Sequence, residues 1–175
     1  MKKKLLLPSK ILTLTDFPVH NGHILKIYFK MCQEGAWKLV PPCPVMKISR
    51  LPFLEGKGKR IARYNSALKS FMKSHPAVEY VLLDGSHRTT AATLANKKTI
   101  TVLFENERDI KEAKALLKTG ELLGLTVDDL MLDVIQDIQK HFLRNPVFET
   151  VEEKAKRMIK ERVVPSYMIS VFTKS

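Results

Sequence analysis

The segment 84–89, which reads DGSHRT, carries side chains that can bind an anion or move a proton. It follows the apolar run 80–83 and precedes the alanine-containing segment 90–95, so it lies where a buried strand is expected to pass into a helix. The first backbone amides of a helix have no partner within it, and together with the helix dipole they favour an anion. Gly85 allows the tight turn and the close approach to a ligand that such a site needs.

The residues after the acid are the expected ligands of a nucleotide or another phosphate-bearing molecule. A guanidinium can hold phosphate through two parallel hydrogen bonds, and hydroxyl and imidazole groups add further donors in the first turn. The expected nucleotide-binding or phosphate-binding residues are Gly85, Ser86, His87, Arg88 and Thr89.

Proton transfer and metal binding are expected from the acid and from two histidines. Asp84, His87 and His20 are the candidate catalytic residues, because imidazole and carboxylate groups are common proton carriers in enzymes. Asp84 is also the candidate ligand of Mg²⁺, which prefers carboxylate oxygens. A competing interpretation gives the turn a purely structural role, in which Asp84 pairs with Arg88 and His87 is exposed to solvent.

The elements that must position this segment follow from apolar periodicity. An alternation of strands and helices along residues 1–105 predicts a mixed α/β (α+β) domain with a small mixed sheet. Ser86 is expected to cap the helix that follows the central strand. The expected strands are 10–15, 45–51, 78–84 and 99–106, and the expected helices are 23–35, 60–75 and 86–97.

Residues 106–175 are predicted to form a helical C-terminal extension. Thr126 with Asp129, and Thr150 with Glu153, have the spacing of capping boxes at helix starts. The segment 166–172 is expected to be a last strand or an extended packing segment.

One apolar stripe in this extension needs a cover. It should pack on the α/β domain or mediate homo-oligomer formation through the C-terminal helices. The stripe consists of Leu130, Val134, Ile138 and the pair His141 and Phe142.

The charge is divided unevenly along the chain. The net charge is +12, and residues 106–175 carry 12 basic and 12 acidic residues, so the whole excess lies in residues 1–105. A basic region favours phosphate partners, either small ligands or nucleic acid, although lysines can also simply solvate a surface.

Composition also bears on compartment. No apolar run approaches the roughly 20 residues of a membrane span, so no membrane partner is expected. The two cysteines form no paired motif, which favours a cytoplasmic location.

The stretch VLLDGSHRTTAATLANKKTITVLFE resembles the signature of the ParB/sulfiredoxin-like superfamily, in which a strand enters a D-G-x-H-R type turn and then a helix with an alanine pair. The upstream LVPPCPVMKISR is similar to the proline-led strand of that family. The resemblance covers about residues 5–105 and implies a ParB/sulfiredoxin-like fold for them. The D-G-x-H-R motif is most similar to that of the archaeal free-serine kinases and their relatives.

The resemblance implies nucleotide chemistry, with two departures in this sequence. Ser86 stands where sulfiredoxins have their catalytic cysteine, so sulfinic acid reduction is not expected. Asn21 stands where the serine kinases place a catalytic glutamate. The function expected is therefore Mg²⁺-dependent phosphoryl transfer to a small molecule, or nucleotide hydrolysis, with ATP or ADP as the nucleotide. The alternative is a ParB-like DNA-binding or nuclease-type module that binds backbone phosphates, with an affinity that falls steeply as salt is added.

Overall fold

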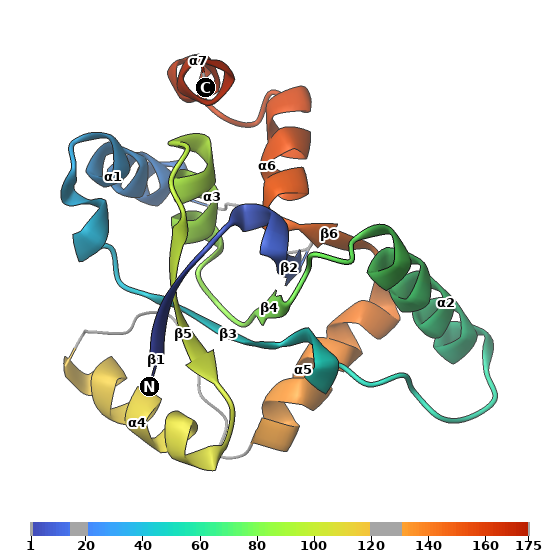
Figure 1. Ribbon diagram of the computed structural model, residues 1–175. Helices are drawn as coiled ribbons and strands as arrows, with labels where there is room; N and C mark the ends of the chain where they lie inside the picture. Colours follow the sequence, from blue (N-terminus) through green and yellow to red (C-terminus); the bar gives the residue numbers. More distant parts are fainter. Residues whose placement is uncertain (1, 15–20, 120–130, 175) are drawn as a thin grey trace.

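A six-stranded sheet forms the centre of the computed structural model, which describes residues 2–14, 21–119 and 131–174 (Figure 1). Across the sheet the strands are β1 (Lys2–Leu6), β5 (Thr99–Phe104), β3 (Cys43–Lys47), β4 (Tyr80–Leu82), β2 (Ile11–Leu14) and β6 (Phe148–Thr150). The pairs β3–β5 and β2–β4 are parallel, and the other three pairs are antiparallel. The predicted mixed α/β class is confirmed.

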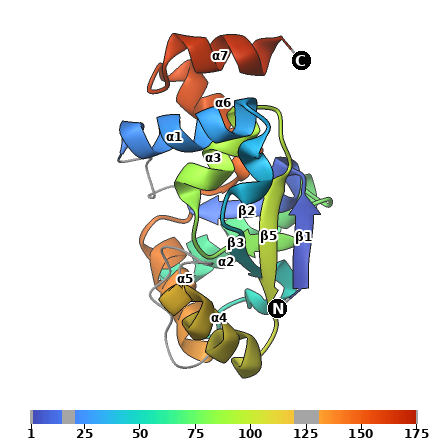
Figure 2. The same ribbon diagram turned by 90° about the vertical axis from the view of Figure 1, so that its left-hand side faces the viewer.

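Alternation along the central strands sends apolar side chains into two separate cores. Val81 points to a core shared with Leu12, whereas its neighbours Tyr80 and Leu82 point to the opposite face. The first face is covered by α2 (Lys59–Ser74), α4 (Glu107–Thr119) and α5 (Met131–Arg144). The opposite side carries α1 (Gly22–Gln33), α3 (Ser86–Leu94), α6 (Val151–Lys160) and α7 (Ser166–Thr173), and Figures 1 and 2 show these helices away from α4 and α5.

Short 3₁₀ turns interrupt the connections where proline or a change of direction prevents a longer element. The N-terminal segment forms two strands, because the turn η1 (Pro8–Lys10) separates β1 from β2. The strand expected at 45–51 ends at residue 47, since η3 (Ile48–Arg50) follows it directly. A third turn, η2 (Ala36–Leu39), begins after Gly35, whose φ of +80° ends α1 as its position predicted.

The C-terminal residues are part of the same core rather than a separate layer. Strand β6 pairs with β2, with Thr150 opposite Leu12. Three residues of the predicted apolar stripe, Val134, Ile138 and Phe142, pack into the core that contains Leu12. The segment 106–175, expected to be a helical extension, thus also supplies an edge strand to the sheet. Leu130 and the capping pair expected at 126 and 129 lie outside the described residues.

Two further predictions for this region have different outcomes. The capping box at the start of α6 is confirmed, since the Glu153 amide donates to Thr150 Oγ1 at 3.1 Å and the Thr150 amide donates to Glu153 Oε2 at 2.8 Å. The prediction of a strand or extended segment at 166–172 is wrong, because these residues form α7. Met168 and Phe172, one helical turn apart, both join the apolar cluster of α1, α3 and α6, and this packing overrides the β-propensity of the segment.

Within the described residues, every helix is too short or too polar to span a bilayer.

Candidate functional site

The carboxyl ends of two parallel strands define the candidate site. Strands β2 and β4 run side by side with Ile11 opposite Tyr80, so both chains leave the sheet at the same edge. Crevices at such edges are where open α/β sheets usually bind ligands. A small pocket here is lined by Thr13, Leu14, Leu82, Leu83, Asp84, Gly85 and Ser86. His20, a predicted catalytic residue, lies just after β2 but outside the described residues.

Gly85 makes the turn from β4 into α3 possible. Its φ of +106° and ψ of +31° lie in the left-handed region, where side chains are strained. A Cβ atom at this position would lie 2.6 Å from the buried Cys43 Sγ. Gly85 is also the N-cap of α3, and its cap has no side-chain hydrogen bond, so the prediction that Ser86 caps this helix is wrong. The chain needs the glycine for the turn, and this places Ser86 one residue inside the helix.

Replacement of Gly85 with alanine is expected to lower the free energy of unfolding by about 1–3 kcal/mol, because it combines backbone strain with overpacking. Chemical denaturation of the Gly85→Ala protein measures the change. The Cys43→Ala background is the matched control, since it removes the sulfur that the new methyl group would meet. Gly85→Ala should cost less in that background than in the wild type. An equal cost in both would show that the strain lies in the backbone alone.

Arg88 lies inside the fold. Its side chain is 5% exposed, and its guanidinium donates to Asp84 Oδ2 at 2.7 Å and to the carbonyl oxygens of Pro41 and Pro42 at 3.2 and 2.8 Å. These bonds tie the start of α3 to the segment that leads into β3. The arrangement matches the structural interpretation of the turn for Asp84 and Arg88, and it gives Arg88 the role of holding the turn in shape.

Thr89 also bonds within the helix. Its hydroxyl donates to the carbonyl oxygens of Gly85 and Ser86, both at 3.1 Å, and the residue is buried. Thr89 therefore stabilises the first turn of α3 from its buried side.

His87 faces the start of α1. Its Nε2 accepts a hydrogen bond from the Asn21 amide at 3.2 Å, and the Asn21 side chain in turn caps α1 by accepting from the amides of His23 and Ile24. Asn21, which stands where the resemblance places the catalytic glutamate of the serine kinases, is thus in contact with His87. The structural interpretation expected His87 to be exposed, but it is half-buried.

Asp84 is the acid of the pocket. Its side chain is 29% exposed, lines the pocket and accepts from Arg88 through Oδ2. Within residues 2–14, 21–119 and 131–174 no group of three or more His, Cys, Asp and Glu side chains is arranged to hold a metal ion. A Mg²⁺ site here would therefore need oxygen ligands from the bound molecule in addition to Asp84.

A lysine from α6 reaches the same turn. Lys154 Nζ donates to Ser86 Oγ at 2.6 Å, although 68 positions separate the two residues in the sequence. Lys154 is 2% exposed, which is rare for a lysine. No motif in the sequence had indicated Lys154 as a site residue. The signal was its place on the buried face of α6, which also carries Val151, Ala155 and Met158.

Burial dominates the electrostatics of Lys154. Removal from water disfavours the ammonium form and lowers the pKa of Lys154 to about 8, against the opposing attraction of Glu149. Glu149 is itself engaged by Arg157, whose Nε and Nη2 donate to its two carboxylate oxygens at 3.0 and 2.8 Å. Lys154 is therefore a cation close to its neutral form, placed beside the hydroxyl of Ser86.

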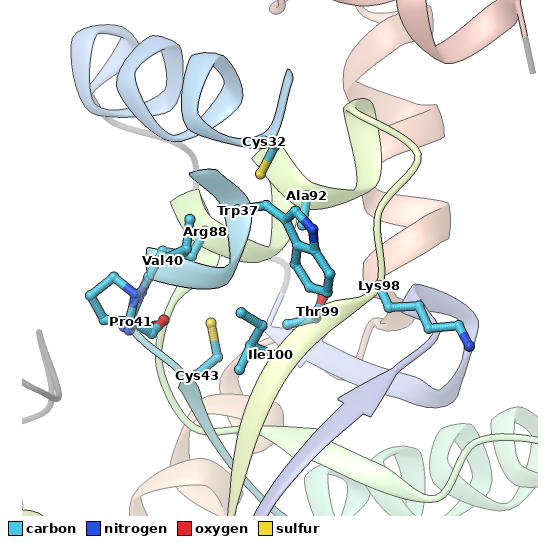
Figure 3. Close-up of a pocket in the computed structure, with 10 residues that line it drawn as sticks. All are labelled: Cys32, Trp37, Val40, Pro41, Cys43, Arg88, Ala92, Lys98, Thr99 and Ile100. Atoms are coloured by element: carbon cyan, nitrogen blue, oxygen red, sulfur yellow. Dashed lines mark hydrogen bonds between the residues drawn. The ribbon is translucent and has the colours of Figure 1, made fainter. Parts of the chain in front are cut away.

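The two cysteines lie behind the turn and do not line this pocket. They line a separate cavity bounded by Trp37, Arg88 and Thr99, and Figure 3 shows both sulfur atoms pointing into it. Burial raises the pKa of Cys32 and of Cys43 to about 11, so both thiols stay protonated near neutral pH. Neither is an activated nucleophile.

No protein-family model, no curated protein and no solved structure matches the chain. The resemblance to the ParB/sulfiredoxin-like superfamily accordingly stays a prediction.

Proposed function

We propose that the protein binds the phosphate group of a small ligand, a nucleotide above all, at the start of α3. The observation that supports this most is the Lys154 ammonium, which α6 places at 2.6 Å from Ser86 Oγ. Ser86, in the first turn of α3, lines a pocket at the carboxyl edge of the sheet, and the buried Lys154 places a positive charge behind its hydroxyl. Each of these groups favours a phosphate.

The ligand contacts in this proposal differ from those expected from the sequence. Ser86 and Lys154 bind the phosphate directly, and Gly85 lets the backbone approach it. His87 lies in the same first turn and is a further donor through Nδ1, since its Nε2 accepts from the Asn21 amide. Arg88 does not contact the phosphate in this proposal, because its bonds to Asp84 and to two carbonyl groups hold the turn in shape.

The chemistry proposed is Mg²⁺-dependent phosphoryl transfer or nucleotide hydrolysis. Magnesium commonly binds one or two carboxylates together with substrate phosphates, and Asp84 is the pocket carboxylate that fits this role. Asp84 would hold the ion while Arg88 keeps its bond to Oδ2. When bound, the ion would neutralise charge that develops on the phosphoryl oxygens.

A thermal-shift panel tests the binding proposal. The full chain is heated with ATP, ADP, CTP or GTP, each with and without Mg²⁺, and with duplex DNA at low and moderate salt. A ligand present at about 100 times its Kd adds about 2.7 kcal/mol of stability, which is about 5–10 °C in Tm for a chain of this size. We expect at least one nucleotide to give such a shift.

Lys154→Met should weaken that nucleotide's binding roughly 10–100-fold, because a hydrogen bond to a charged group contributes about 1.5–3 kcal/mol. Lys156→Met is the matched control, since Lys156 lies on the same helix, is 58% exposed and pairs with Glu152. If no nucleotide shifts Tm, or if both variants bind like the wild type, the proposal is wrong. If DNA alone stabilises the chain, with a steep loss on adding salt, the DNA-binding alternative replaces it.

A further inference from the structure

Ser86 and Lys154 have the arrangement of a nucleophile and its base. A serine hydroxyl becomes a nucleophile when an adjacent base accepts its proton, and a lysine can serve as that base. The 2.6 Å separation of Ser86 Oγ and Lys154 Nζ fits a hydrogen bond in either direction. An ammonium donates to the hydroxyl oxygen, and a neutral amine accepts the hydroxyl proton.

The surrounding fold holds both partners in place. Ser86 is the first residue of α3 and follows the constrained Gly85 turn, so its hydroxyl is presented at the wall of the pocket. Lys154 sits in the first turn of α6, which the capping box of Thr150 and Glu153 fixes. A nucleophile and a base held on two packed helices need little rearrangement before they react.

We propose that Ser86 accepts a phosphoryl group from a bound nucleoside triphosphate, with Lys154 as the general base. This inference rests on the proposed nucleotide-binding function and names the residue that reacts. The sequence resemblance places the catalytic cysteine of sulfiredoxins at this position, and the contact with Lys154 is the observation that gives the serine here a base.

The proposed reaction is a direct displacement at the γ-phosphorus. Ser86 Oγ forms a bond to the γ-phosphorus, and the bond from that phosphorus to the bridging oxygen breaks. The electron pair of the broken bond stays with the departing nucleoside diphosphate, and the hydroxyl proton moves to Lys154 Nζ. The products are a phosphoserine at residue 86, the diphosphate and a lysine ammonium beside the new phosphate. That ammonium then stabilises the phosphoserine as an ion pair.

The lowered pKa of Lys154 suits the role of a general base in this arrangement. With a pKa of about 8, about half of the Lys154 side chains are neutral at pH 8 and can accept a proton. An ordinary lysine in water would be almost entirely protonated at that pH. The rate of phosphoryl transfer should therefore rise with pH up to about 8 and then level off.

Acid-quenched mass spectrometry of the full chain tests the inference. The protein is mixed with Mg²⁺ and saturating ATP, GTP or CTP, stopped at short times, and analysed for the mass of one added phosphoryl group and for its position by peptide mapping. We expect the group on Ser86, at a rate that follows the pH profile above. Ser86→Ala should bind the same nucleotide more weakly, because it loses a hydroxyl contact to the phosphate, and should still show a thermal shift at saturating concentration. At that concentration it should carry no label, because the acceptor oxygen is gone.

Ser166→Ala is the matched control, because Ser166 is likewise the first residue of a helix, α7, and should label as the wild type does. A nucleotide that shifts Tm but leaves Ser86 unmodified at every time and pH overturns this inference and leaves the binding proposal standing. Labelling at another residue, or a rate that does not change between pH 6 and 9, also overturns it. An absence of any nucleotide shift overturns the binding proposal and this inference together.

Discussion

Replacement of Lys154 with methionine is expected to raise the free energy of unfolding of the ligand-free protein at pH 7 by about 3 kcal/mol. The same replacement removes the proposed contact with the ligand phosphate. Burial lowers the pKa of Lys154 from 10.5 to about 8, and this difference measures how much the folded state disfavours the ammonium. Methionine has a similar length and carries no charge to desolvate. Glu149, whose charge favours the Lys154 ammonium, keeps its two hydrogen bonds from Arg157 in the variant.

The same shift predicts how the effect depends on pH. Below about pH 8 Lys154 is charged in both the folded and the unfolded chain, and the full penalty of burial is present. Between about pH 8 and 10.5 the unfolded chain holds a proton that the folded chain has released, so wild-type stability rises with pH. The advantage of Lys154→Met should therefore shrink across this interval. Other titrating groups are common to both proteins, so they cancel in the difference.

Urea denaturation of both proteins at pH 7, 8, 9 and 10 measures this narrowing. The exposed Lys156→Met variant should stay within about 0.5 kcal/mol of the wild type at pH 7. If Lys154→Met lowers the free energy of unfolding at pH 7, Lys154 is a structural ion-pair partner. Its burial beside Ser86 then does not destabilise the folded protein. A stabilised variant that no longer binds nucleotide would show instead that the chain keeps a costly buried charge for its function.

Local sequence patterns predicted the sheet and most helices because those patterns are set by neighbours along the chain. The alternation of strands and helices, the end of α1 at Gly35 and the Thr150–Glu153 capping box all depend on residues a few positions apart. The helix α7 was missed because its conformation depends on packing against α1 and α3, far away in the sequence. Strand β6, three residues long, was missed because only its pairing with β2 makes it a strand.

The site was predicted in part for the same reason. The motif indicated where the chain turns from strand to helix, and the structure places Gly85 and Ser86 at a pocket there. The partners of those residues come from elsewhere: Lys154 from α6, and the carbonyl groups of Pro41 and Pro42. A sequence motif cannot show which of its charged groups is already used by such partners. Arg88 is the clearest example.

Arg88→Ala is expected to lower the free energy of unfolding by about 3–5 kcal/mol, the usual cost of breaking a buried ion pair by removing one member. The motif alone predicted the reverse, a loss of phosphate binding with the fold intact. The side chain is 5% exposed in the structure, with its guanidinium against Asp84 and two prolyl carbonyl groups. Its removal leaves these acceptors without their donor, and the turn that presents Ser86 loses its support.

A double-mutant cycle with Asp84→Ala separates the two roles of Arg88. If the pair is structural, the double variant should be more stable than the sum of the single changes predicts, by about 1–3 kcal/mol. Arg63→Ala, an exposed arginine on α2, is the control and should change stability by at most about 0.5 kcal/mol.

Nucleotide binding by Arg88→Ala is measured at low temperature, where the variant is still folded. Its affinity should fall only in proportion to the fraction of molecules in which the turn is disordered. An Arg88→Ala protein as stable as the wild type but unable to bind would show that Arg88 breaks its bond to Asp84 and binds the ligand directly. In that case the ion pair between them is the resting state of a switch that the phosphate opens.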